Sequence, residues 1–230
     1  MKKLIPYIII VIVIIVGYYV NAEILRQYKE NSPAQSSSSN IQSKDNKEKK
    51  KGNSIDDKFA TILVYPKKKA LLEFELWDFE QNIFTNSDFD GKWSLIFTGY
   101  TNCPDICPNT LNDLTHLYQA LNENLREQFQ FTFFSVDPER DTPERMKAYL
   151  DNFHSDFIGI SGKKDQVDSL VHQLGGVYNL NKNEGEYYSV DHSGRIFIVD
   201  PDGNRFGILK SEVLQSKDKS KLVKELENLL

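Results

Sequence analysis

Cys103 and Cys107 are the residues of this sequence whose type and spacing point most directly to chemistry. They are its only two cysteines, four positions apart in a chain of 230 residues. Two cysteines so near each other in sequence cannot form the disulfides that close long loops and stabilise small secreted domains. Their role is therefore local: the two sulfur atoms can bind a soft metal ion, or they can cycle between dithiol and disulfide.

The sequence around the cysteines predicts the junction of a strand and a helix. The apolar segment Ser94 to Gly99 ends just before the pair, and Pro108 opens a helical pattern that continues to Leu121. Two thiols at the start of a helix can converge on one point, and the exposed amides there favour thiolate over thiol. We therefore expect an accessible pair of thiolates.

A third ligand is needed, because two thiolates leave a metal ion short of partners. Met146 is the only methionine after the first residue, which excludes a methionine-rich site. His192 is the best candidate because it directly precedes an apolar strand and could lie beside the cysteine helix, although a structural role explains this histidine equally well. The other histidines sit in or beside charged helices without a second ligand nearby, and we expect them to be structural: His116, His154 and His172. Copper and zinc both suit such a donor set.

Strand and helix patterns alternate along the C-terminal three quarters of the chain. The predicted strands are Leu71–Phe79, Ser94–Gly99, Phe129–Val136, Phe157–Ser161, Arg195–Val199 and Arg205–Leu209. The predicted helices are Pro108–Leu121, one that Thr142 caps before Pro143, Lys164–Leu174 and Ser211–Leu230. A turn at Asp200–Gly203 makes the last two strands a hairpin. This order predicts a mixed α/β sheet with helices on both faces, in a thioredoxin-like arrangement.

The N-terminal quarter has a different character. Residues 1–22 hold an uncharged run, Leu4 to Val20, behind two lysines, and we expect an uncleaved transmembrane helix that anchors the chain. A signal peptide cleaved near Ala22 is the alternative. Residues 23–54 are mostly polar and predict a disordered linker, and residues 55–230 form the folded domain. The domain is expected on the extracytoplasmic side of a cell membrane.

Composition narrows the function further. The formal net charge is −5 and 27 % of the residues are charged, whereas a nucleic-acid-binding surface requires an excess of basic residues. We therefore expect no nucleic-acid partner.

Three ordered motifs resemble the Sco (SenC) family of copper proteins. They are Thr101–Pro108 (TNCPDICP), Val136–Glu144 (VDPERDTPE) and Asp191–Ser193 (DHS), which stands before a strand and an Asp-Gly turn. The resemblance extends over roughly Leu71 to Leu230. One departure is the segment from Leu76 to Phe84, which lacks the glycine-containing turn of many relatives.

The resemblance implies one copper ion per chain, as Cu(I) or Cu(II), on Cys103, Cys107 and His192. It also implies a metallochaperone that helps to assemble the CuA centre of cytochrome c oxidase, with subunit II of the oxidase or a similar membrane protein receiving the copper. Another copper chaperone would be the donor. The acidic residues Asp105 and Asp137 match family positions, although helix or turn capping explains each equally well.

Two other functions fit the cysteines. A thiol-disulfide oxidoreductase would need only the cysteine pair, and it would reduce cysteines of the oxidase subunit or of another extracytoplasmic protein. The three intervening residues favour a chelate over the Cys-x-x-Cys spacing of thioredoxin-type reductants. A peroxide-reducing enzyme would need an arginine beside Cys103, for which Arg140 and Arg195 are the candidates.

Overall fold

The computed structural model describes residues 59–182 and 188–230, and its centre is an eight-stranded mixed sheet. The strand order is β1-β10-β9-β4-β5-β6-β2-β3. The bounds are β1 Ile62–Ala70, β2 Leu76–Asp78, β3 Ile83–Phe84, β4 Trp93–Gly99, β5 Phe129–Ser135, β6 Ile158–Ser161, β9 Ile196–Val199 and β10 Asn204–Leu209. Strands β4, β5 and β6 run parallel, and β9 pairs antiparallel with β4.

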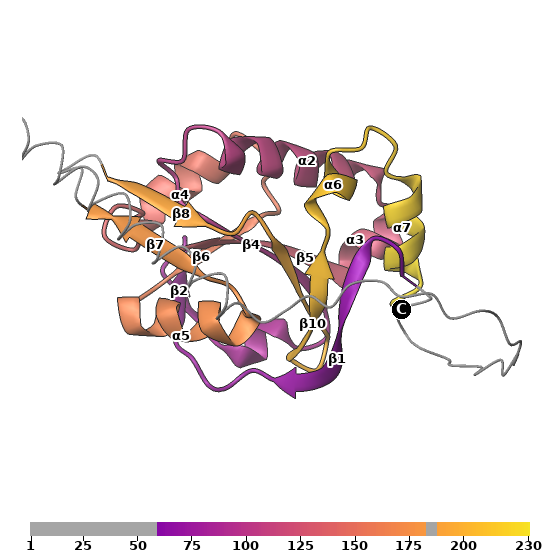
Figure 1. The fold of residues 1–230 in the computed structure, drawn as a ribbon, viewed down its shortest axis with the longest axis horizontal. Coiled ribbons are helices and arrows are strands. Elements are labelled where there is room, and N and C mark those ends of the chain that lie inside the picture. The colour runs from indigo at the N-terminus through magenta and orange to yellow at the C-terminus, as the bar shows by residue number, and fades with distance from the viewer. Residues whose placement is uncertain (1–58, 183–187) are drawn as a thin grey trace, which may run out of the picture. The chain divides into compact units, whose positions relative to one another are not determined.

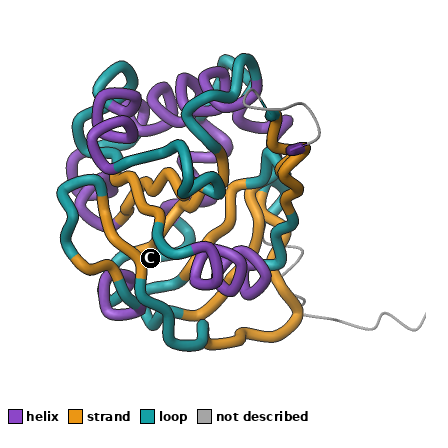
Figure 2. Tube along the Cα trace, turned by 90° about the vertical axis from the view of Figure 1, so that its left-hand side faces the viewer, coloured by secondary structure: helices purple, strands orange, loops and turns teal. Residues whose placement is uncertain are grey.

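The sheet is buried at its centre because helices cover both of its faces. Every residue of β4 and β9 is buried, as expected for strands with apolar side chains on both sides. Helices α2 and α4 lie on one side and α5 on the other (Figure 1), and the view turned by 90° shows the same layers (Figure 2). The helices are α2 Ile106–Ala120, α3 Glu123–Gln128, α4 Pro143–Leu150, α5 Lys164–Leu174, α6 Ser211–Leu214 and α7 Ser220–Glu227.

A separate two-stranded ribbon stands beside the main sheet. Its strands are β7 Tyr178–Asn181 and β8 Ser189–His192, paired antiparallel with Tyr178 opposite His192. The ribbon was not predicted, because its strands are short and mostly polar. It matters for function, since β8 ends at the histidine singled out above.

Most predicted elements are confirmed within one or two residues, including the mixed sheet with helices on both faces. The strand predicted at Leu71–Phe79 is wrong over its first half. There the side chain of Asn86 bonds the backbone instead of a neighbouring strand: its Oδ1 accepts from Phe74 N at 3.1 Å, and its Nδ2 donates to Leu71 O at 3.1 Å. The last predicted helix is divided into α6 and α7, and Lys219 binds the carbonyl of Leu214 at the break.

The departure noted near Leu76 is a tight hairpin between β2 and β3. Gln81 takes the positive φ of 68° that glycine adopts most easily. Asp78 stabilises this turn, since its Oδ1 accepts the backbone N–H groups of Glu80 at 2.8 Å and Asn82 at 2.9 Å.

The predicted anchor and linker lie outside the described residues. Within residues 59–182 and 188–230, no helix is long and apolar enough to cross a membrane.

Candidate metal centre

Cys107 lies in the first turn of α2, and Cys103 lies in the loop that connects β4 to this helix. Helix α2 begins at Ile106, two residues earlier than predicted, so that Pro108 is its third residue. Gly99, the last residue of β4, permits the close approach of Cys107: a Cβ at this position would lie 2.8 Å from Cys107 Sγ and 2.8 Å from the ring of Phe133. The end of β4 and the start of α2 are therefore in close contact at the Cys107 thiol.

The structure brings His192 to the cysteine pair. Cys107 Sγ lies 3.2 Å from His192 Nε2, and the ligand atoms of Cys103, Cys107 and His192 all lie within 4.8 Å of one another. Cys107 is fully buried, Cys103 is 9 % exposed and His192 is partly exposed. Both cysteines are free thiols. The three residues predicted as metal ligands thus form one cluster, of which His192 is the most exposed member.

Contacts with the end of β4 fix the position of the imidazole. The ring of Phe97 meets it edge-on with centroids 6.1 Å apart, and the ring of Tyr100 does so at 5.8 Å. Thr98 Oγ1 donates to Ser193 O at 3.2 Å, which ties the residue after His192 to the same strand. His192 Nδ1 lies 3.4 Å from Ser193 O. These contacts leave Nε2 directed at the sulfur atoms.

The two thiols differ strongly in acidity. A hydrogen bond from Cys107 is the largest influence on Cys103 and lowers its pKa to about 4; burial opposes this, while His192 and the backbone N–H groups of Asp105 and Cys107 favour the thiolate. The same thiol–thiolate bond, together with burial, raises the pKa of Cys107. At neutral pH the apo protein therefore holds one thiolate, Cys103, and one protonated thiol, Cys107.

The loop that carries the cysteines is held by residues of the second motif. Asp141 is buried, and its carboxylate accepts from Thr101 N at 2.9 Å and from Thr101 Oγ1 at 2.6 Å. Burial raises the pKa of Asp141, against hydrogen bonds that favour its charged form. From α4, Arg145 Nε donates to Thr101 Oγ1 at 2.9 Å. The motif was visible in the sequence, but these contacts were not predicted.

The acidic residues named from the sequence have separate places. Asp105 is the N-cap of α2, and its side chain accepts from Asn109 Nδ2 at 2.7 Å. Asp137 is buried and forms an ion pair with Arg140. Its Oδ1 also accepts from Tyr188 Oη at 2.6 Å. Asp105 holds the N-cap position without a capping bond from its side chain, and the side-chain partners of both residues are other side chains.

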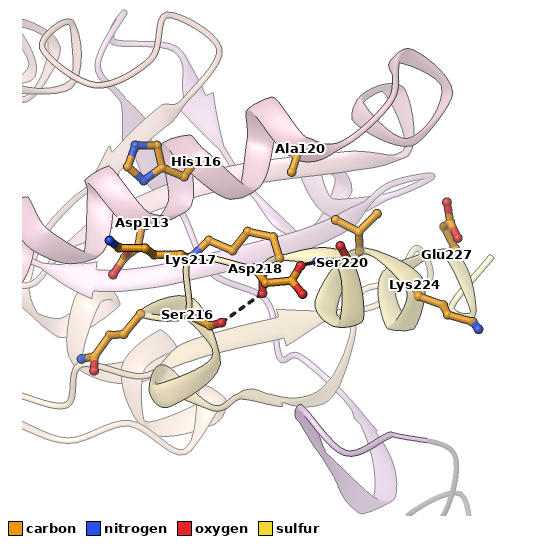
Figure 3. Close-up of a pocket in the computed structure, with 12 residues that line it drawn as sticks. Asp113, His116, Ala120, Ser216, Lys217, Asp218, Ser220, Lys224 and Glu227 are labelled. Atoms are coloured by element: carbon orange, nitrogen blue, oxygen red, sulfur yellow. Dashed lines mark hydrogen bonds and ion pairs between the residues drawn. The ribbon is translucent and has the colours of Figure 1, made fainter.

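The remaining histidines lie away from the cysteines. His154 packs on the ring of Tyr118 with centroids 4.2 Å apart, and His172 is exposed on α5. His116 lines a hollow of about 1090 Å³ between α2 and the α6–α7 segment (Figure 3). In this hollow Asp113 forms an ion pair with Lys219 at 3.7 Å. Within the described residues, no second group of metal-binding side chains is present.

The two candidate arginines for peroxide reduction, Arg140 and Arg195, have different surroundings. Arg140 binds Asp137 and donates from Nη1 to Tyr188 O at 2.8 Å, and Arg195 is exposed. Neither arginine has a contact with Cys103 among the described interactions. The geometry thus gives no support to peroxide reduction.

The three donor atoms suit a soft metal ion and leave it without a fourth protein ligand. Two sulfur atoms and one imidazole nitrogen match the preferences of Cu(I) and of zinc. An apolar hollow of about 360 Å³ opens beside the histidine and is lined by Val177, Tyr178, Asn179, Asp191, His192 and Ser193. This hollow adjoins the imidazole, which is the most exposed of the three candidate ligands.

Comparisons with known proteins agree with this architecture. The sequence model of SCO1/SenC matches residues 46–230. A protein of Stutzerimonas stutzeri named for copper binding is 37% identical over 153 residues, which cover 66% of this chain and 74% of that protein. Mitochondrial SCO2 of Saccharomyces cerevisiae is 37% identical over 132 residues, 56% of this chain and 44% of that protein.

A solved structure is similar over the folded part. The copper-bound structure of ScoI from Bradyrhizobium japonicum is 30% identical with a TM-score of 0.63, and the match covers 70% of this chain and 100% of that one. The fold is therefore the thioredoxin-like fold of the Sco proteins. With the match over residues 46–230, these findings show that this chain belongs to the SCO1/SenC family.

Proposed function

We propose that the protein is a copper metallochaperone that binds one copper ion through Cys103, Cys107 and His192. The single observation that carries the proposal is the convergence of these three ligand atoms within 4.8 Å of one another. The copper-bound relative from Bradyrhizobium japonicum supports copper over zinc, which the donor set alone does not distinguish.

The arrangement suits delivery of the ion better than permanent storage. Three ligands leave a coordination position for a fourth donor, and His192, the most exposed of the three, has an apolar hollow beside it. Because thiolates of a second protein can replace these ligands one at a time, the ion need not be released to solvent. The resemblance to the family suggests subunit II of cytochrome c oxidase as the recipient, where the copper would enter the CuA centre, and another copper chaperone as the donor.

The second candidate is reduction of disulfides by the same cysteine pair. Its support is the low pKa of Cys103, about 4, beside a protonated Cys107 that can resolve a mixed disulfide. The histidine distinguishes the two functions. Copper binding uses His192 as a ligand, whereas thiol exchange requires only the sulfur atoms.

The N-terminal quarter completes the proposal. Residues 1–22 would anchor the protein in the cell membrane as a single transmembrane helix, and residues 23–54 would tether the domain of residues 55–230 on the extracytoplasmic side. The hydrophobic run Leu4–Val20 and the polar composition that follows it support this organisation. The topology can be tested by fusing a periplasmic reporter enzyme to Leu230, which would be active only on the proposed side.

A transfer experiment tests the function. The full chain, reduced and loaded with Cu(I), is mixed with the apo form of a CuA-bearing domain of oxidase subunit II whose cysteines are reduced. The proposal predicts that Cu(I) moves from the donor to the target, and that adding a one-electron oxidant such as ferricyanide then produces the absorption of the mixed-valence CuA centre. Copper that stays on the donor, combined with rapid reduction of a disulfide form of the same target by the metal-free protein, would favour the oxidoreductase.

A further inference from the structure

One segment contacts both halves of the candidate site. It comprises residues Asp137–Asp141, which follow β5, and we call it the bridging segment. One half of the site is the cysteine loop, between β4 and α2. The other half is the β7–β8 ribbon, which carries His192.

The contact with the cysteine loop is made by Asp141, as described above. Its fully buried carboxylate bonds both the backbone N–H and the hydroxyl of Thr101, and it also accepts from Ser135 Oγ at 2.6 Å. Since Ser135 ends β5, this contact ties the loop to the central sheet.

The contact with the ribbon centres on Tyr188, the residue before β8. Arg140 Nη1 donates to Tyr188 O at 2.8 Å, and the guanidinium carbon lies 3.6 Å from the centroid of the Tyr188 ring. Tyr188 Oη donates to Asp137 Oδ1 at 2.6 Å. The backbone, ring and hydroxyl of this tyrosine are therefore all held by the bridging segment.

Arg140 also faces the cysteine side. Its guanidinium carbon lies 5.5 Å from the ring centroid of Tyr100, and the Tyr100 ring in turn packs edge-on against His192 with centroids 5.8 Å apart. The guanidinium thus has one tyrosine from each half of the site as a neighbour. Its Nη2 is buried without a hydrogen-bond partner among the described residues, so hydrogen bonds alone do not account for the position of this group.

We infer that Arg140 is a positioning residue that holds His192 in place over the cysteine pair. It acts through Tyr188, which leads into β8, and through Tyr100, which packs on the imidazole. The inference rests on the proposed function for its copper readout, but the position of His192 can also be measured in the metal-free protein.

Arg140→Met tests this directly, and Arg126→Met is its matched control. Arg126 also lies over a tyrosine ring, with its guanidinium carbon 5.1 Å from the Tyr118 centroid, and donates to the carbonyls of Tyr118 and Gln119 at 3.0 Å. It belongs to α3, which precedes β5, whereas Arg140 follows β5. Loss of a group that orients a metal ligand lowers metal affinity by about 10- to 100-fold, which is the fall in Cu(I) affinity expected for Arg140→Met and not for Arg126→Met.

Measurements on the metal-free protein test the role of Arg140 without relying on copper binding. Amide hydrogen exchange at Val190–His192 should become faster in apo Arg140→Met, with a changed imidazole resonance for His192, and both should stay unchanged in Arg126→Met. Arg140→Lys should restore little, because an ammonium lacks the planar fork that binds a carbonyl and stacks on a ring.

If Arg140→Met does not fold, the same hydrogen-exchange measurement can be made on Tyr188→Phe. This variant retains the ring under Arg140 and loses only the bond to Asp137, so a smaller change in the same direction is expected. Wild-type exchange at Val190–His192 in folded Arg140→Met, or in Tyr188→Phe if only that variant folds, would overturn the inference. If the wild-type protein bound no copper, the proposed function would be wrong. The exchange rates would still show whether Arg140 positions His192.

Discussion

Cys107 Sγ lies 3.2 Å from His192 Nε2, although the two residues are 85 positions apart in the chain. The contact joins the first turn of helix α2 to the end of β8, a strand of the two-stranded ribbon. A histidine in this position can complete a metal site and can also stabilise a thiolate.

The unequal acidity of the two thiols predicts selective alkylation of the apo protein. Because the pKa of Cys103 is lowered to about 4, its labelling by iodoacetamide should be half-maximal near that pH and constant through neutrality. Cys107, whose pKa is raised, should stay unlabelled at neutral pH. Mass spectrometry after short pulses of iodoacetamide measures the labelling of each cysteine separately. A common midpoint near the ordinary thiol pKa of about 8.5 would contradict this account.

Gly99→Ala should destabilise the apo protein and disturb the site. The added Cβ would lie 2.8 Å from both Cys107 Sγ and the Phe133 ring, which are themselves fully or almost fully buried. Overpacking of this kind costs about 1–3 kcal/mol, measurable by urea unfolding. Gly194→Ala is the matched control, because its Cβ would meet only the flexible end of Ile106, at 3.1 Å. Equal loss in both variants would argue against the close approach at Gly99.

Glu225 should make stability depend on pH. Burial opposes its ionisation, but hydrogen bonds from Thr61 and from the N–H of Ala60 outweigh burial and hold its pKa below the usual range. A lowered pKa contributes stability above the unfolded value of about 4.3, and this contribution is lost as the pH falls through the folded pKa.

Glu225→Gln should therefore cost about 1–3 kcal/mol at pH 7 and progressively less in acid, by denaturant unfolding at several pH values. Glu227→Gln is the control, since Glu227 is exposed on the same helix. A pH-independent difference between wild type and Glu225→Gln would refute the assignment.

The sequence allowed good prediction where local signals are strong. Helix α5 was predicted at its observed bounds, and the start of α4 at Pro143 follows from Thr142, whose side chain caps it. Strand β1 was missed because Pro66 and a run of three lysines hide its pattern, although proline and lysine are common on edge strands. Sequence patterns therefore predict the bounds of helices and strands whose start and end are marked by their own residues.

Prediction of the candidate site from the sequence was limited in the same way, because contacts between distant segments have no local signal. The three proposed ligands could be selected by residue type, spacing and family resemblance, and the structure places them together. The contacts of Arg140 with Tyr188 and of Asp141 with Thr101 join segments 48 and 40 residues apart. Such long-range pairs leave no periodic trace in the sequence. The motif that contains Arg140 and Asp141 was recognised, but its role as a bridge required the fold.

A copper titration of the reduced full chain tests the three-ligand site most directly, comparing wild type with His192→Ala and measuring stoichiometry and absorption. We expect one tightly bound copper per wild-type chain and clearly weaker binding in His192→Ala, while Cys103 and Cys107 in that variant still form a disulfide on oxidation. Copper affinity that is the same in both proteins would contradict the three-ligand site.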